Sequence, residues 1–143
     1  MESDEEHKIV RAILEQDNCF SETGIDFQRW AKTIYFPLLL MSERRTFTIN
    51  DGDELTEHLR ALETAALQQG IARLQTRIQS LSTMGPKVAI VRTIRDRLGA
   101  NEEIIGSTSM TWTLIHTANS WRINQIYFND SRYDPSVVFQ VFS

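Results

Sequence analysis

TWTLIHTANSWRINQIYF, residues 111–128, is the stretch that decides the fold. Apolar and polar side chains alternate on both sides of a short turn at Asn119-Ser120, which indicates a β-hairpin with one buried face. A two-residue loop there places His116 opposite Ile123, and alternation along each strand then assigns every other side chain to one of two faces. The face predicted to point toward the core holds Met110, Trp112, Leu114, His116, Ile123, Gln125 and Tyr127. The other face is rich in threonine, and we expect it to be exposed or covered by another subunit.

Strand-like segments surround this hairpin in the second half of the chain. Residues 72–83, 87–98, 104–118 and 121–130 have the composition of long strands, and turns rich in glycine, proline and asparagine separate them. The segments follow one another without a linker or a repeat. They therefore predict an antiparallel meander.

The first half of the chain has helical periodicity instead. Residues 5–18 place Ile9 and Ile13 on one stripe, which predicts a first helix. A second helix is predicted from Phe27, after the cap residue Asp26, to about residue 35, because Pro37 disfavours further helix. Residues 44–49 look like a short strand. A third helix is predicted from the capping residues 51–54 to Gly70, which is suited to a helix end.

Composition narrows the class of protein. The 143 residues are enough for one domain, 1–143, and too few for two cores. A net charge of −4 argues against a nucleic-acid surface, which needs a basic stripe. The longest apolar run, residues 36–41, is too short to cross a bilayer. The acidic start is unlike a signal peptide, and the single cysteine, Cys19, cannot form an internal disulfide. We therefore expect a cytoplasmic protein with no membrane and no nucleic-acid partner.

The order of elements resembles that of the nuclear-transport-factor-2-like superfamily, and within it the SnoaL-like domains. Three short segments carry the resemblance: DFQRWA at 26–31, DGDEL at 51–55 and SWRINQI at 120–126. The resemblance implies an α+β fold in which three N-terminal helices pack in the concave face of a strongly curved, mainly antiparallel sheet, forming a cone or α+β barrel whose open end often holds a pocket. Members include ketosteroid isomerases, polyketide cyclases, dehydratases, epoxide hydrolases and non-catalytic domains, so the activity does not follow from the fold.

The ketosteroid isomerases offer one comparison of catalytic positions. Their carboxylate base lies shortly before the third helix, a position that corresponds to about Glu43 here. Their oxyanion hole takes a tyrosine from the first helix and a protonated carboxylate from the strand of Trp112. This chain has neither residue at those places. Glu43 is therefore either a lone acid at the pocket or a surface acid beside Arg44.

The candidate ligand-binding residues are Trp30, Glu43, Trp112, His116, Gln125 and Tyr127. His116 can act as a general base if it has a pocket and a partner, or it can be a hydrogen-bonded residue at the rim of the sheet. The aromatic residues can line a cavity or form ordinary core. His58 flanks the apolar stripe of the third helix and is interpreted as structural or solvated. No spacing typical of a metal site or a phosphate loop occurs, so no metal or cofactor is predicted.

Two functions remain open from the sequence. The first is a pocket-containing domain that binds a small, mostly apolar molecule, as a binder or as an enzyme with isomerase-, cyclase- or dehydratase-like acid-base chemistry. The second is a non-catalytic dimerising scaffold whose cone is filled by side chains. A homodimer is expected in either case, through the outer sheet face, where Ile115, Ile126 and Phe128 interrupt the threonines, or through the apolar tail at residues 137–142.

Overall fold

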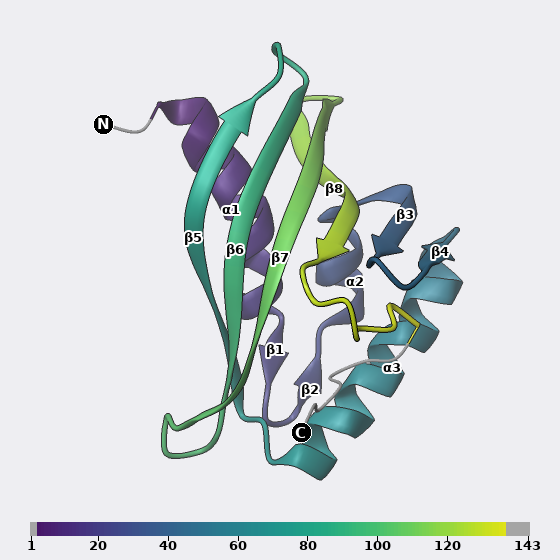
Figure 1. Ribbon diagram of the computed structural model, residues 1–143, viewed down its shortest axis with the longest axis vertical. Helices are drawn as coiled ribbons and strands as arrows, with labels where there is room; N and C mark the ends of the chain where they lie inside the picture. The colour runs from purple at the N-terminus through teal and green to yellow at the C-terminus, as the bar shows by residue number, and fades with distance from the viewer. Residues whose placement is uncertain (1–2, 137–143) are drawn as a thin grey trace.

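Four long strands form the antiparallel meander that the sequence predicts (Figure 1). They are β5 (Arg73–Thr83), β6 (Val88–Leu98), β7 (Ile104–Thr117) and β8 (Ser120–Phe128). The computed structural model describes residues 3–136, and within them the sheet has the order β4-β3-β8-β7-β6-β5. The helices lie on its concave side, so the α+β cone architecture is confirmed. The apolar tail at residues 137–142, one of the two surfaces expected to form a dimer, lies outside the described residues.

Two helices are as predicted. Helix α1 (Asp4–Asn18) begins after Ser3, whose side chain accepts a hydrogen bond from the Glu6 amide. Helix α3 (Gly52–Gln69) begins after Asp51, whose carboxylate accepts a bond of 2.9 Å from the Glu54 amide. It ends at Gly70, which has a left-handed conformation with φ of 71°. A small hairpin of β1 (Phe20–Ser21) and β2 (Gly24–Ile25) follows α1.

The prediction for the second helix is wrong in its length. Helix α2 (Phe27–Ala31) is capped by Asp26 as expected, but residues 34–41 form a strand, β3 (Ile34–Met41). Strand β3 runs parallel to β8 and antiparallel to β4 (Thr46–Ile49). Its pairing with β8 is irregular between Ile34 and Leu39, a stretch that contains Pro37, which has no amide hydrogen for a regular ladder. Pairing inside the sheet therefore overrides the helical spacing of Ile34 with Trp30.

The hairpin of β7 and β8 has a different register from the predicted one. Thr117 pairs with Ser120, and the loop is Ala118-Asn119, whose positive φ values of 48° and 68° are those of a type I′ turn. A bulge then shifts the register, because Leu114 pairs with Ile123 whereas Thr113 pairs with Gln125. The extra residue on β8 inverts the faces beyond it.

This inversion corrects the predicted faces of β8. Ile126 and Phe128, which we expected outside, are buried and contribute to the core. Gln125 and Tyr127, which we expected inside, are half-buried on the opposite face. The inward positions predicted for Met110, Trp112, Leu114 and Ile123 are confirmed, since all four are buried.

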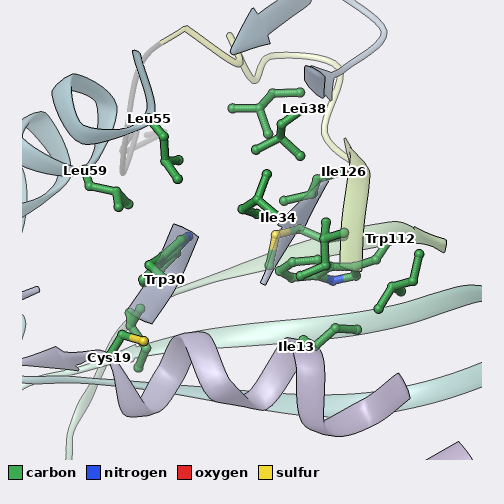
Figure 2. Packing of buried hydrophobic residues seen from close by; sticks show 14 of the residues in the cluster. Ile13, Cys19, Trp30, Ile34, Leu38, Leu55, Leu59, Trp112 and Ile126 are labelled. Carbon is green, nitrogen blue, oxygen red and sulfur yellow. The ribbon is translucent and has the colours of Figure 1, made fainter. Parts of the chain in front are cut away.

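The core fills much of the space between the helices and the concave face of the sheet. Ile13 of α1 lies on one side of it, Leu55 and Leu59 of α3 on another, and Trp112 of β7 on the sheet (Figure 2). Full burial of each such side chain contributes about 1.5–3 kcal/mol, so these contacts hold α1 and α3 against the sheet. Among the described residues, no helix has both the length and the apolar content needed to cross a membrane.

Candidate functional site

A cavity of about 90 Å³ lies between α3, β3 and the concave face of β6, β7 and β8. Its walls are mostly aliphatic and aromatic. Leu55 and Leu59 of α3 face Leu38 and Ile126 across the interior (Figure 2). Among residues 3–136, the polar side chains that reach it are Gln16, His58, Arg95, Arg97, Thr108 and Tyr133. Because about 10–15 Å³ of such space holds one water, the cavity has room for several waters or for part of a small organic molecule.

Trp30 and Trp112 form part of the cavity wall, and the guanidinium of Arg95 lies close to both rings. The indole Nε1 of Trp112 donates a hydrogen bond of 2.8 Å to the hydroxyl of Thr93, and both side chains are fully buried. The guanidinium carbon of Arg95 lies 5.1 Å from the ring centre of Trp112 and 5.9 Å from that of Trp30. These distances are within the range of cation–π attraction, so the aromatic rings fix the position of the charge.

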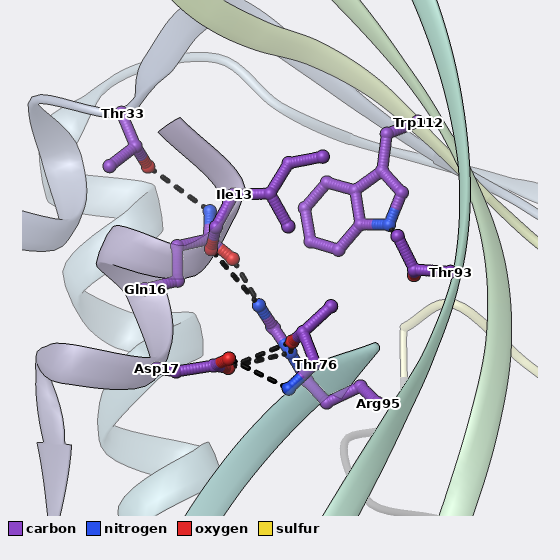
Figure 3. A network of polar contacts seen from close by, with 8 residues as sticks. All are labelled: Ile13, Gln16, Asp17, Thr33, Thr76, Thr93, Arg95 and Trp112. Atoms are coloured by element: carbon purple, nitrogen blue, oxygen red, sulfur yellow. Dashed lines mark hydrogen bonds and ion pairs between the residues drawn. The ribbon is translucent and has the colours of Figure 1, made fainter. Parts of the chain in front are cut away.

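Arg95 is also the centre of a buried polar network that joins α1 to β5 and β6 (Figure 3). Its Nε lies 3.2 Å from a carboxylate oxygen of Asp17 and donates a bond of 2.8 Å to the hydroxyl of Thr76. Its Nη1 donates to the Oε1 of Gln16 at 3.2 Å, and the Nε2 of Gln16 donates to the hydroxyl of Thr33 at 3.0 Å. Burial lowers the pKa of Arg95, and the charge of Asp17 opposes this effect. The positive charge of Arg95 is therefore compensated within the fold.

Arg97 lies two residues further along the same face of β6. It is 7% exposed, and its Nη1 donates a bond of 2.7 Å to the hydroxyl of Thr108. Its partner across the ladder is Gly106, where a β-carbon would overlap the guanidinium. Glycine at this position thus leaves the space that the charged group occupies.

Tyr133 reaches the cavity from the segment after β8. Its ring stacks on Phe128, with ring centres 4.2 Å apart. Burial raises its pKa to about 12, and the nearby charge of Arg97 partly opposes this shift. Tyr133 is therefore a neutral hydroxyl near pH 7, which can donate a hydrogen bond.

His58 projects from α3 toward the cavity. Burial lowers its pKa to about 4, so the imidazole is neutral near pH 7. Within the described part of the chain it makes no hydrogen bond. Leaving such a group unpaired in a partly buried site costs free energy, which a ligand that bonds to it would recover.

The six predicted site residues do not come together. Trp30 and Trp112 line the cavity. Glu43 is exposed in the turn between β3 and β4, away from the lining residues. His116 lies at the far end of β7, with its ring 5.1 Å from that of Trp121, and it too is outside the cavity wall. Gln125 and Tyr127 are on the outer face because of the bulge.

Most of the polar lining is not predicted from the sequence. The spacing of His58 from Leu55 and Leu62 indicates the flank of a helix stripe, but it also allows the inward position that His58 has. The inward positions of Arg95 and Arg97 could have been predicted from alternation along β6, where every second residue from Val91 to Arg97 is buried. Burial raises the pKa of the single cysteine, Cys19, to about 11, so it is a thiol near pH 7 and unsuited to nucleophilic chemistry.

Solved structures with this arrangement come from several bacteria. A domain of unknown function with a cystatin-like fold from Nostoc punctiforme superposes with a TM-score of 0.70 at 10% identity, over 90% of this chain and 78% of that one. An NTF-2 like protein of unknown function from Shewanella oneidensis gives 0.67 at 17% identity, over 88% and 99% of the two chains. A ketosteroid isomerase-like protein from Erwinia carotovora atroseptica gives 0.59 at 16% identity, over 90% and 97%. At these identities the similarity shows the fold alone.

Sequence comparison defines the family. No curated protein matches the chain significantly. The sequence model of the family described as "NTF2-like protein (DUF6841)" matches residues 11–131, which include all the helices and long strands except the first turns of α1. The resemblance noted in the sequence is thereby confirmed, and the chain belongs to this NTF2-like family.

Proposed function

We propose that the cavity between α3 and the sheet binds a small, mostly apolar molecule. The observation that carries the proposal is an apolar cavity onto which a few polar side chains converge, among them His58, which makes no hydrogen bond to the described residues. This combination is typical of ligand sites, where apolar walls give affinity and a few polar groups give orientation.

The free energy of burying apolar surface and of pairing a polar group supports the proposal. A ligand that fills this space would cover the apolar walls from water and offer the imidazole of His58 a hydrogen-bond partner. The alternative of a scaffold with a filled cone accounts for neither feature.

The lining favours binding over carboxylate-catalysed isomerisation. No acidic side chain is among the described residues that line the cavity, and Glu43 is exposed in a distant turn. His58, with a pKa of about 4, is a weak base. Its neutral ring is better suited to hydrogen bonding a ligand than to abstracting a proton.

The test is a thermal-shift screen of small cyclic and linear compounds, with tryptophan fluorescence as a second measurement because Trp30 and Trp112 line the cavity. A compound at a hundred times its dissociation constant should stabilise the fold by roughly 2.7 kcal/mol. Leu62→Trp, which places a larger side chain in the cavity wall, should abolish binding. Leu67→Trp is the matched control, since this residue of the same helix is 80% exposed. Equal binding by both variants, or no binding to the wild type, would refute the proposal.

A further inference from the structure

The cavity adjoins a second hollow at one end. A groove of about 390 Å³ lies beside it, lined by residues 105–109 of β7 and by side chains of the segment that follows β8. Arg97, Thr108 and Tyr133 line both the cavity and the groove, so the two spaces adjoin at these side chains. Arg97 and Thr108 belong to paired strands of the sheet and are joined by a hydrogen bond. Tyr133 lies outside the sheet, so its side chain is the part of this boundary that can change without altering a strand.

We propose that the ring of Tyr133 sets the size limit of the ligand, because it closes the cavity toward the groove and stops any molecule that extends past it. This inference rests on the proposed function and specifies the size of the molecules that the cavity accepts.

The segment after β8, residues 129–136, places Tyr133 at this boundary. It runs from the end of β8 toward α3 (Figure 1). At its start, the amide of Asn129 donates a hydrogen bond of 3.0 Å to the main-chain oxygen of Ser109 on β7. A turn follows, in which the amide of Tyr133 donates a bond of 3.0 Å to the main-chain oxygen of Asp130. The turn thus directs the tyrosine back toward the cavity.

The ring of Tyr133 is held in place from two sides. It stacks on Phe128, with ring centres 4.2 Å apart and an angle of 11° between the planes. The hydroxyl of Ser42, just after β3, donates a bond of 2.6 Å to the main-chain oxygen of Tyr133. The next residue, Asp134, lies 3.5 Å from a guanidinium nitrogen of Arg45. These contacts do not involve the phenol hydroxyl, so a phenylalanine at this position would keep the ring where it is.

The volume of the cavity shows how small the ligand must be. An apolar cavity of about 150 Å³ accommodates benzene. The cavity here has about 90 Å³, so a molecule as large as benzene exceeds it and a short aliphatic chain is the class that fits. A longer chain meets the ring of Tyr133 before it reaches the groove.

The experiment measures the dissociation constants of primary alcohols from ethanol to octanol by NMR chemical-shift titration, which detects the weak binding of small molecules. The affinity of wild type should rise with chain length, reach a maximum and then fall, because longer chains meet the ring. In Tyr133→Ala the rise should continue beyond the wild-type maximum, by roughly fourfold for each methylene, which corresponds to about 0.8 kcal/mol of buried apolar surface.

Three further variants isolate the effect of the ring. Tyr133→Phe keeps the ring and should retain the wild-type maximum. Tyr133→Leu removes the ring but keeps an apolar contact with Phe128, so it tests the inference even if Tyr133→Ala does not fold, and its maximum should also move to longer chains. Tyr35→Ala is the matched control, because Tyr35 is 39% exposed on β3 and is not among the described residues that line the cavity.

The outcomes separate this inference from the proposed function. If alcohols bind and the maximum is the same in wild type, Tyr133→Ala and Tyr133→Leu, the size limit lies elsewhere and the inference is wrong, while the binding function stands. A shift in Tyr133→Phe or in Tyr35→Ala as large as that in Tyr133→Ala would also contradict a limit set by the ring. If no alcohol and no compound of the wider screen binds, the proposed function itself fails.

Discussion

Replacing Trp112 by alanine tests whether the concave face of β7 is the structural centre of the protein. Trp112 is fully buried, and its indole contacts both the aliphatic core and the guanidinium of Arg95. Thr113, the next residue, is half-buried on the opposite face of the sheet. The two positions are adjacent in sequence but lie on opposite faces, so a small loss at both would mean that Trp112 is not in the core.

The magnitude follows from the contacts. Truncation of a buried tryptophan to alanine typically costs about 3–5 kcal/mol. It also leaves the hydroxyl of Thr93 without its bond to the indole, which costs about 1–3 kcal/mol more if no water replaces the donor. Trp112→Phe retains most of the ring volume and loses mainly that bond, so we expect about 1–3 kcal/mol. Thr113→Ala should cost less than about 1 kcal/mol.

Urea denaturation followed by circular dichroism measures these differences without relying on the fluorescence of the residue that is changed. A domain of this size is stable by about 5–15 kcal/mol, so Trp112→Ala should leave a marginal fold or none. Similar, small losses for Trp112→Ala and Thr113→Ala would refute the assignment of the two faces. A loss for Trp112→Phe as large as that for Trp112→Ala would show that the hydrogen bond, not packing, dominates.

Asp17→Asn should destabilise the fold by roughly 3 kcal/mol in urea melts, because it leaves the buried charge of Arg95 uncompensated. Asp130→Asn, which removes one partner of an exposed ion pair, should cost less than about 1 kcal/mol. Equal losses for the two variants would contradict a structural role for the pair of Asp17 and Arg95. The His58 pKa of about 4 lies below the ordinary 6.5, so the unfolded chain binds the proton more readily between these values. Wild type should therefore lose stability relative to His58→Leu as pH falls from 6.5 toward 4, by about 1.4 kcal/mol per unit of pKa difference. If the free energy of unfolding has the same pH dependence in both proteins, the imidazole is not buried. We also expect a homodimer through the outer face around Ile90, Ile115 and Tyr127; Ile115→Arg should yield a monomer in sedimentation equilibrium at micromolar concentration, and a monomeric wild type would exclude this interface.

Helix and strand ends that depend on residues close in the sequence could be predicted from capping and turn residues. The carboxylate of Asp51 and the left-handed Gly70 mark the ends of α3, and both act within one turn of the helix. The long strands were predicted to within about three residues at each end, because their turns contain glycine, proline or asparagine. Strand β3 was missed because its stability comes from pairing with β8, a segment far away in the sequence.

The bulge in β8 left a trace in the sequence that period-two alternation overlooked. The buried apolar residues of this strand are Trp121, Ile123, Ile126 and Phe128. Their spacing is two, then three, then two, and the step of three falls where the register shifts. An alternation carried unbroken past Ile123 assigns Gln125 and Tyr127 to the core. A strand with one step of three is better interpreted as two half-strands joined at a bulge.

The two arginines of β6 show why the site itself could not be predicted in the same way. Arg95 and Arg97 have the same residue type, strand and face, and alternation alone predicts that both point inward. Their surroundings differ, because α1 brings Asp17 against Arg95, whereas Arg97 donates a hydrogen bond to Thr108 of β7. A charge in a core is stable only with compensation. For Arg95 the compensating group is a carboxylate of the chain itself. That carboxylate lies far from Arg95 in the sequence, so the pattern along β6 indicates that the side chain points inward but not what its charge contacts.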